Sequence, residues 1–357
     1  MPAIHQLVAG FNRGDAISNE ATVMRDVFRG WGYASDIWCE TRRILPELRG
    51  EARELEGLAA VCRPDDVVLL HLSIGSPVNL VFPALPGRKA LLYHNITPAE
   101  YFSLVQPATA QLLAKGREQA RALAGIAAIR LADSRYNADE LEALGHGRTE
   151  VLPLILDYDR LRLPPDRRTL AQYDDGRTNV LFVGRCAPNK KLEDVLAAFA
   201  CFQKAVDPQA RLILAGSFAG TERYQRLLVG MARELRLNEV VFTGAIPQAE
   251  LNACYRAARV FLCMSEHEGF CIPLVEALVH RVPILAYAAA AVPETLAGAG
   301  VLFAEKSFPA VAEMLARLAQ PGALREAVLA GQDTRLKQFR GRDLAAELRR
   351  HLAPVLA

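Results

Sequence analysis

The sequence predicts an α/β protein made of two doubly wound domains in series, and three observations lead to this fold class. Short apolar runs alternate with longer segments of helical spacing, which is typical of parallel sheets covered by helices. The alternation stops at residues 161–177, where prolines, a glycine and many charges replace it, and then starts again. The length of 357 residues suits two domains of roughly 150 residues each.

The first series of elements gives a domain over residues 1–165. Residues 67–72 form a nearly continuous apolar run, as expected for a buried parallel strand. Residues 20–31 have helical spacing that ends before Gly32, and residues 42–60 form a charged amphipathic pattern. In order, we predict strands at 5–10, 35–39, 67–72, 89–94, 129–133 and 150–154, and helices at 20–31, 42–60 and 107–128.

The second series gives a domain over residues 175–340, joined to the first by the segment 161–177. In order, we predict strands at 180–183, 211–215, 240–243, 260–264 and 283–286, and helices at 192–204, 223–235, 248–257, 273–280, 310–318 and 324–340. Ligands of doubly wound sheets bind at the carboxyl ends of the strands. We therefore expect both domains to face a central cleft.

Composition excludes several classes of protein. Lys and Arg total 42 and Asp and Glu total 40, so the net charge of +2 disfavours a nucleic-acid binder. Seven scattered cysteines fit a reducing cytoplasm better than a disulfide framework. The N-terminus lacks the pattern of a signal peptide, and no run has the length and apolarity of a membrane helix. A cationic stretch at 111–135 leaves a peripheral contact with the inner face of the membrane open.

The strongest local pattern runs from Ser265 to Leu278, between a predicted strand and a helix. Pro273 suits the first turn of that helix, so the backbone amides before it are free to bind an anion such as phosphate. Glu268 and Glu276 flank these amides, and their carboxylates would accept hydrogen bonds from sugar hydroxyls. The alternative is a helix whose acidic start merely complements its dipole.

A second pattern follows the first strand of the second domain. Gly184 allows the chain to turn, and Arg185 and Lys190 then place two cations on one loop, where they could neutralise a diphosphate. An ordinary charged surface loop is the alternative, and we prefer that interpretation for Lys191. The two patterns together are more specific than either alone.

With Arg185, Lys190 and the Glu268-x7-Glu276 pair in one α/β domain, the sequence resembles the retaining GT-B glycosyltransferases of family 4. The resemblance is specific over about residues 180–303 and weaker before them. It includes a strand and glycine turn at 211–216 and a Phe-x-Gly-x-x-Pro segment at 242–247. It implies a GT-B fold whose last helix, about 341–357, packs back on the first domain.

The resemblance also implies a role for each matching residue. Arg185 and Lys190 would bind the donor diphosphate, Glu268 the hydroxyls of the transferred sugar, and Glu276 the ribose hydroxyls. The remaining donor-binding positions would be Gly216, Gly244, Gly269, Phe270, Cys271 and Ile272. Many members of the family carry a second glycine where this chain has Cys271, and this departure bears on the fit of the donor sugar.

In the first domain, the resemblance implies an acceptor-binding loop after the first strand, with Gly14 and Asp15. It also implies a histidine at a strand end that approaches the reacting sugar. His94, followed by Asn95, fits this role best, and His71 is the competitor. A histidine hydrogen-bonded at the edge of the core is the alternative for both.

No metal site is predicted. Asp157 and Asp159 have the Asp-x-Asp spacing of metal-dependent glycosyltransferases, but they precede the connecting segment and are interpreted as turn residues. Cys263, His267 and Cys271 are spaced by four, yet no close Cys-x-x-Cys pair supports zinc.

The sequence therefore predicts a cytoplasmic, metal-independent hexosyltransferase with catalytic residues Glu268, His94, Arg185 and Lys190 and no cofactor. It would move a hexose from a donor such as a GDP- or UDP-hexose to a glycan, lipid-linked or polysaccharide acceptor, with retention of configuration. Two alternatives stay open: a GT-B sugar-nucleotide epimerase or phosphorylase, and a two-domain sugar-binding protein without catalysis. The sequence does not fix the oligomeric state.

Overall fold

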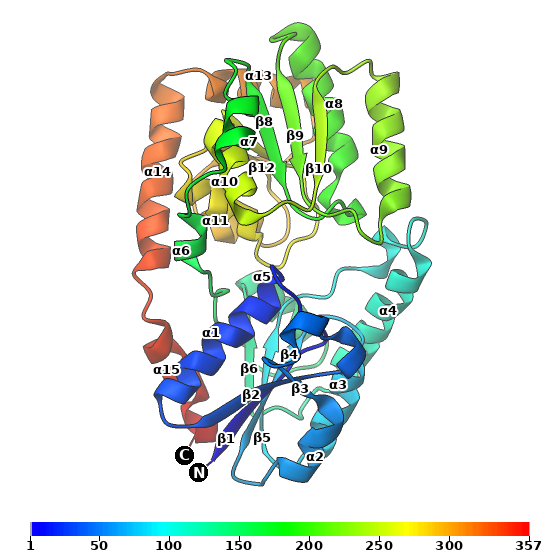
Figure 1. Cartoon of the computed structure of the whole chain (residues 1–357), viewed down its shortest axis with the longest axis vertical. Coiled ribbons are helices and arrows are strands. Elements are labelled where there is room, and N and C mark those ends of the chain that lie inside the picture. The colour runs from blue at the N-terminus through cyan, green and yellow to red at the C-terminus, as the bar shows by residue number, and fades with distance from the viewer. Residues whose placement is uncertain (1, 357) are drawn as a thin grey trace. The chain divides into compact units, whose positions relative to one another are not determined.

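The computed structural model describes residues 2–356 as two compact α/β units (Figure 1). The first unit contains the chain up to Glu100, residues 108–157 and the chain from Arg342 onward, and the second contains Tyr101–Pro107 and Tyr158–Gly341. Each unit is built on one parallel sheet, of seven strands in the first and six in the second. The predicted fold class is therefore confirmed.

The sheet of the first unit has the strand order β3-β2-β1-β4-β5-β6-β7, and the order reverses between β1 and β4. The helix α15 packs beside α1, with Leu348 and Leu352 in the same apolar core as Met24 and Phe28. The elements of this unit are β1 (Ala3–Leu7), α1 (Ala16–Gly30), β2 (Ala34–Cys39), β3 (Arg53–Glu54), α2 (Leu58–Val61), β4 (Val67–Leu72), α3 (Pro77–Val81), β5 (Arg88–Tyr93), α4 (Pro107–Ala122), β6 (Ile129–Ala132), α5 (Arg135–Ala143), β7 (Glu150–Val151) and α15 (Leu344–Leu356).

The sheet of the second unit has the order β10-β9-β8-β11-β12-β13, with its reversal between β8 and β11. The helices α8, α9 and α13 share one apolar core with the strands. The elements are α6 (Tyr158–Leu161), α7 (Arg167–Tyr173), β8 (Asn179–Val183), α8 (Leu192–Ala205), β9 (Arg211–Ala215), α9 (Glu222–Glu234), β10 (Val240–Gly244), α10 (Gln248–Ala257), β11 (Val260–Cys263), α11 (Ile272–Val279), β12 (Ile284–Tyr287), α12 (Val292–Leu296), β13 (Val301–Phe303), α13 (Phe308–Ala319) and α14 (Ala323–Arg340).

The helix predicted at residues 42–60 is wrong. This segment instead forms short 3-10 turns, the strand β3 and the short helix α2. Pro46 starts one of these turns, and it cannot donate the backbone hydrogen bond that a continuous helix needs at this position. The apolar spacing of the segment reflects several short contacts with the core rather than one helical face.

The segment predicted as a connection, residues 161–177, also differs from the prediction. It contains α7, whose first turn is capped by the Asp166 side chain accepting from the Thr169 N–H at 2.7 Å. Tyr173 is buried at the other end of this helix, which packs on α10. Asp159, interpreted as a turn residue, lies in α6. The side-chain cap from Asp166 and the burial of Tyr173 thus stabilise a helix in a segment where apolar residues do not recur at helical spacing.

None of the helices formed by the described residues is long and apolar enough to cross a membrane.

Candidate active site

The loops after β8 and β11 are neighbours, because these two strands pair directly at the reversal of strand order in the second unit. This reversal is the place where doubly wound sheets bind ligands. The side chain of Asn189, in the first loop, donates to the His267 carbonyl at 3.0 Å, and the Glu266 N–H donates to the Asn189 carbonyl at 3.0 Å. These two hydrogen bonds tie the predicted cationic loop to the predicted acidic loop.

Glycine is required where the loop after β9 approaches this region. Gly216 has a φ of 149°, and a Cβ atom added there would lie 2.0 Å from the Gly184 carbonyl oxygen. The Gly216 N–H donates to the Gly244 carbonyl at 3.1 Å, so the predicted glycine turns of β9 and β10 are joined. The close backbone approach leaves no room for a side chain.

Lys190 and Glu268 form the central contact of the site. The Lys190 Nζ lies 2.5 Å from the Glu268 Oε2, and their side chains are 20% and 8% exposed. Burial would lower the pKa of Lys190, but the Glu268 carboxylate outweighs it and raises the pKa above its ordinary value. Two residues that are far apart in the sequence thus form a charged pair at the reversal of strand order.

Arg185, the other predicted cation, is exposed and lies on the same loop as Lys190. Its Nη2 donates to the Ala219 carbonyl at 3.4 Å. This contact holds Arg185 near the loop after β9, where the Glu222 carboxylate also interacts with its charge.

The backbone from Glu268 to Ile272 is held in an unusual shape. Cys271 has a φ of 70° and precedes the first residue of α11. This left-handed conformation favours glycine, which gives a physical reason for the glycine that family members carry here. The Ala291 N–H donates to the Glu268 carbonyl at 3.2 Å, and the Thr295 hydroxyl donates to the Phe270 carbonyl at 2.5 Å. Contacts from the α12 region therefore fix the segment that contains Gly269.

Glu276 lies inside α11 and has a partner of its own. The Tyr255 hydroxyl donates to the Glu276 Oε2 at 2.8 Å. Burial raises the pKa of Glu276, and this hydrogen bond only partly offsets the effect. The Tyr255 ring stacks on His280 at 5.0 Å between centroids, so the hydroxyl is firmly placed. Sequence reasoning did not identify Tyr255, because nothing in its neighbourhood marks it as a partner of a residue on the next helix.

In the first unit, Gly14 and Asp15 form the turn before α1. Gly14 has a φ of 73°, and the Asp15 Oδ2 accepts from the Ser18 N–H at 2.9 Å and from the Ser18 hydroxyl at 2.7 Å. Asp15 thus caps α1, which gives it a structural role beside the predicted one.

His94 and His71 lie next to each other and form a pair. Their rings are nearly parallel, with centroids 5.1 Å apart, and the His71 Nδ1 lies 2.9 Å from the His94 Nε2. The His94 Nδ1 lies 3.1 Å from Asp133 Oδ2 and 3.5 Å from Glu20 Oε2. The His71 Nε2 contacts the Gln6 Oε1 at 3.0 Å. The His94 side chain is only 2% exposed, and both of its ring nitrogens are engaged.

The charges around this pair fix its protonation. Burial disfavours the charged form of His94, but Asp133 and Glu20 outweigh it and raise the pKa of His94 to about 9. Burial lowers the pKa of His71 well below its ordinary value, and His94 adds to this effect. Burial raises the pKa of Glu20 to about 8 against the opposing effect of His94. At neutral pH, an imidazolium at His94 therefore donates to Asp133 and to a neutral His71.

Asn95 lies next to this network but has other partners. Its Nδ2 donates to Asn137 Oδ1 at 2.8 Å and to Glu140 Oε2 at 3.2 Å. Its φ of 76° is a left-handed conformation that asparagine tolerates.

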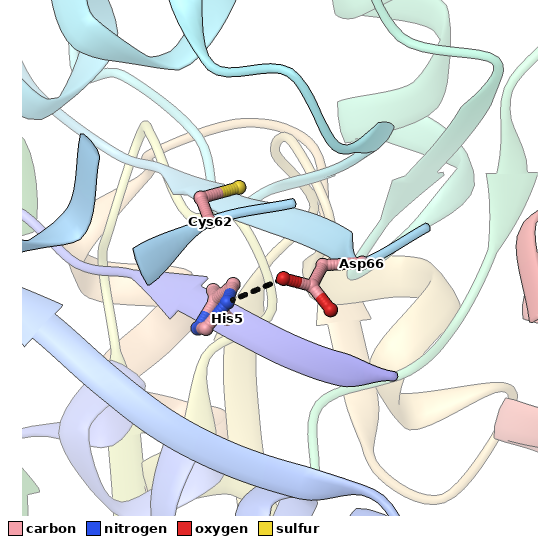
Figure 2. A group of neighbouring side chains, drawn as sticks. All are labelled: His5, Cys62 and Asp66. Atoms are coloured by element: carbon pink, nitrogen blue, oxygen red, sulfur yellow. Dashed lines mark hydrogen bonds and ion pairs between the residues drawn. The ribbon is translucent and has the colours of Figure 1, made fainter. Parts of the chain in front are cut away.

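Three groups of side chains among the described residues bring metal-ligating atoms within 4.8 Å of one another. Figure 2 shows one of them, in which His5 on β1 is joined to Asp66 while the Cys62 side chain stands to one side. The Trp38 indole N–H donates to His5 Nδ1 at 3.1 Å, so the proton of a neutral His5 lies on Nε2, 3.2 Å from Asp66 Oδ2. No lone pair on His5 is then available, and this group does not fit a metal.

The second group consists of Glu20, His71 and His94, and it does not fit a metal either. The His94 Nε2–H donates to the His71 Nδ1, so this hydrogen bond occupies both nitrogens and leaves neither lone pair for a metal. The third group consists of Cys263, Glu268 and Cys271.

Two Rossmann-like units with this charged pair at a reversal of strand order define the class of GT-B glycosyltransferases. The family model "Glycosyl transferases group 1" matches residues 168–352, which is more than half of the chain. The chain belongs to this family, and the predicted resemblance is confirmed at that level.

Two relatives show where the similarity lies. The chain is 27% identical over 159 residues to the O-antigen chain mannosyltransferase B of Escherichia coli, which covers 44% of this chain and 41% of that protein. It is 35% identical over 112 residues to a GDP-mannose-dependent alpha-mannosyltransferase of Mycolicibacterium smegmatis, which covers 31% of this chain and 26% of that protein. The chain thus spans less than half the length of these curated relatives.

Solved structures match the whole chain in fold. Sucrose-phosphate synthase from Thermosynechococcus elongatus has a TM-score of 0.72 at 17% identity and covers 99% of both chains. Anabaena HepE, solved in complex with UDP and glucose, has a TM-score of 0.70 at 17% identity and covers 100% of this chain and 99% of its own. These similarities show the GT-B fold and nothing finer.

Proposed function

We propose that this chain is a retaining hexosyltransferase of family 4 that transfers a sugar from a nucleotide-diphosphate donor without a metal ion. The observation that supports this most is the pair of Lys190 and Glu268, 2.5 Å apart, at the reversal of strand order and within the segment that the family model matches. An ammonium group suits a phosphate oxygen, and a carboxylate suits sugar hydroxyls. One contact therefore marks the junction between the diphosphate and the sugar of a donor.

Each donor-binding residue then has a defined task in the proposal. Lys190 and Arg185 bind the diphosphate together with the backbone amides around Gly269 at the start of α11. Glu268 accepts hydrogen bonds from the hexose hydroxyls. Glu276, placed by the Tyr255 hydroxyl, accepts hydrogen bonds from the ribose.

The chemistry follows from the charge that develops on the leaving group. The bond between the anomeric carbon and the diphosphate oxygen breaks, and the sugar becomes oxocarbenium-like. Fixed cations and amides stabilise the negative charge where it develops, without having to reorganise. The acceptor hydroxyl forms the new bond on the same face, and its proton passes to the departing phosphate oxygen. This route gives retention without a protein nucleophile.

His94 contributes a buried positive charge in this proposal rather than a hydrogen bond from its ring, because both ring nitrogens are engaged. Gly14, Asp15 and Asn95 line the acceptor side at the carboxyl ends of β1 and β5. The acceptor is a glycan, lipid-linked or polysaccharide hydroxyl, and the enzyme acts in the cytoplasm or at the inner face of the membrane.

GDP-mannose is the first donor to test, because several relatives in this region are mannosyltransferases and some are named for GDP-mannose. A thermal-shift screen with GDP, UDP, dTDP and ADP, followed by the matching nucleotide sugars, would identify the base. The proposal expects stabilisation by one base above the others. A chain that no nucleotide stabilises would instead behave as a sugar-binding protein.

Neighbouring lysines provide a matched control for the site. Lys190→Met removes the ammonium that contacts Glu268, whereas Lys191→Met removes one that lies 3.4 Å from Glu193 and 3.6 Å from Glu266. With the donor identified in the screen, Lys190→Met should abolish transfer of a radiolabelled hexose and Lys191→Met should retain it. Equal turnover by both variants would contradict the site assignment.

A further inference from the structure

Two thiols and a carboxylate converge at the start of α11. Cys263 is the last residue of β11, Cys271 precedes α11, and Glu268 lies on the loop between them. Their ligand atoms all lie within 4.8 Å of one another. All three residues are buried, with exposures of 1%, 7% and 8%. The spacing by four noted in the sequence thus does bring two cysteines together, with Glu268 rather than His267 beside them.

The donor set is the kind that binds soft and borderline cations. Thiolates and one carboxylate are common ligands of Zn²⁺, which is four-coordinate and tolerates an open fourth position. Neither cysteine is in a disulfide, and the Cys263 Sγ would give up only a long hydrogen bond of 3.4 Å to the Ser265 Oγ on binding a metal. Cys271 is the left-handed residue just before α11, so it belongs to the loop rather than to the helix.

The charges of the surroundings also suit an occupied site. Binding would convert both thiols to thiolates, whose two negative charges cancel those of a divalent cation. The remaining charge of Glu268 is then balanced by Lys190, whose ammonium lies 2.5 Å from it. A buried cluster of ions is tolerated when its charges are paired in this way.

We propose that Cys263, Cys271 and Glu268 form an inhibitory site for a thiophilic divalent cation such as Zn²⁺, overlapping the donor-sugar position. The overlap rests on the proposed function of Glu268, whereas the metal site itself does not. On binding, two S–H bonds lose their protons to solvent and two metal–sulfur bonds and one metal–oxygen bond form, with no oxidant or reductant. Glu268 is then no longer free to accept from a sugar.

The test uses the full chain, reduced and freed of metal by a chelator, and titrated with CdCl₂ as a spectroscopic probe and then with ZnSO₄. Cadmium should produce the ultraviolet charge-transfer band of a cadmium–thiolate bond, saturating at one ion per chain. Zinc should abolish the band by displacement. A chain that shows no band would overturn the site.

Variants separate this site from the other cysteines. Cys271→Gly removes one ligand and fits the left-handed backbone better, so the fold should survive. Cys263→Ser removes the other ligand with little change of volume. Each should weaken cadmium binding at least about 100-fold, since even the loss of an outer-shell partner costs up to that much. Cys201→Ser, in α8, should bind cadmium as the parent chain does. A cadmium affinity that is unchanged in both ligand variants would also overturn the site.

The overlap with the donor has a separate test. Saturating GDP-mannose, or whichever nucleotide sugar the thermal-shift screen selects, should slow cadmium binding and weaken its apparent affinity about tenfold or more. An affinity unchanged by a nucleotide sugar that demonstrably binds would overturn the overlap. Turnover of the metal-free chain tests the proposed transferase function independently of the metal site. Absence of turnover would therefore contradict the function, and absence of a cadmium band would contradict the metal site.

Discussion

The buried imidazolium at His94 can be tested by removing its main counter-ion. Asp133→Asn keeps the shape of the side chain and an acceptor for the His94 Nδ1–H, but it removes the negative charge 3.1 Å away. Burial then dominates, so the pKa of His94 should fall from about 9 toward or below its ordinary value. At pH 7.5 the variant should therefore hold a neutral ring at His94, where the parent chain holds a charged one.

The size of the effect follows from the raised pKa. A rise from the ordinary 6.5 to about 9 corresponds to about 3 kcal/mol of preference for the charged form in the folded chain. This stability is fully present below the pKa of an unfolded histidine and is lost as the pH rises through about 9. Little discount for solvent applies, because the His94 side chain is 2% exposed.

The assay is NMR titration of the chain labelled with [¹³C]histidine, with His94→Gln used to assign the resonance. Thermal unfolding between pH 6.5 and 10 gives the linked stability, which should decline more steeply in the parent than in Asp133→Asn. Glu20 also titrates in part of this range and its pKa depends on both Asp133 and His94, so the NMR resonance of His94 is the decisive readout and the stability difference is supporting. Asp139→Asn, which removes an exposed carboxylate of α5, should leave the His94 titration unchanged. A His94 resonance that titrates alike in the parent and in Asp133→Asn would refute the reasoning.

Three further predictions concern the second unit. Gly216→Ala should destabilise by at least about 2 kcal/mol in urea unfolding, because its Cβ meets the backbone, whereas Gly230→Ala, in α9 with open space around it, should be neutral or stabilising by up to about 1 kcal/mol. Tyr255→Phe removes a hydrogen bond that lowers the pKa of Glu276, so this carboxylate should protonate at a higher pH in the variant. As the pH is lowered, nucleotide binding measured by calorimetry should therefore weaken earlier in the variant than in the parent. Asn189→Ala removes a tie between the two loops and should weaken donor binding without changing the nucleotide preference. The first prediction is contradicted if Gly216→Ala is as stable as the parent. The second is contradicted if Tyr255→Phe leaves the pH profile of binding unshifted, and the third if Asn189→Ala binds the donor with unchanged affinity.

The sequence was sufficient for the parts of the fold that rest on local patterns. The strands β4, β8 and β11 are predominantly apolar runs, and the loops that follow β8 and β11 carry the predicted polar residues. The pairing of these strands follows from doubly wound topology, so the contact between Lys190 and Glu268 follows from where their loops lie.

Other features could not be predicted from local patterns. The partners of His94 come from α1 and from the end of β6, and only the folded sheet brings Glu20 and Asp133 to the same ring. The segment 42–60 has helical spacing, but Pro46 and its contacts with the core override it. Cys263 and Cys271 are too far apart in sequence for a familiar zinc motif, and the turn between β11 and α11 brings them together.

The central claim is that a nucleotide-sugar donor binds at the contact between Lys190 and Glu268, and calorimetric titration of the donor selected in the screen tests it most directly. The parent chain and Lys191→Met should bind that donor with the same affinity and with one site per chain. Lys190→Met should bind it at least about tenfold more weakly, since a charge-assisted hydrogen bond contributes about 1.5–3 kcal/mol. Equal affinity in Lys190→Met and Lys191→Met, or no binding of any nucleotide sugar to the parent chain, would contradict the account.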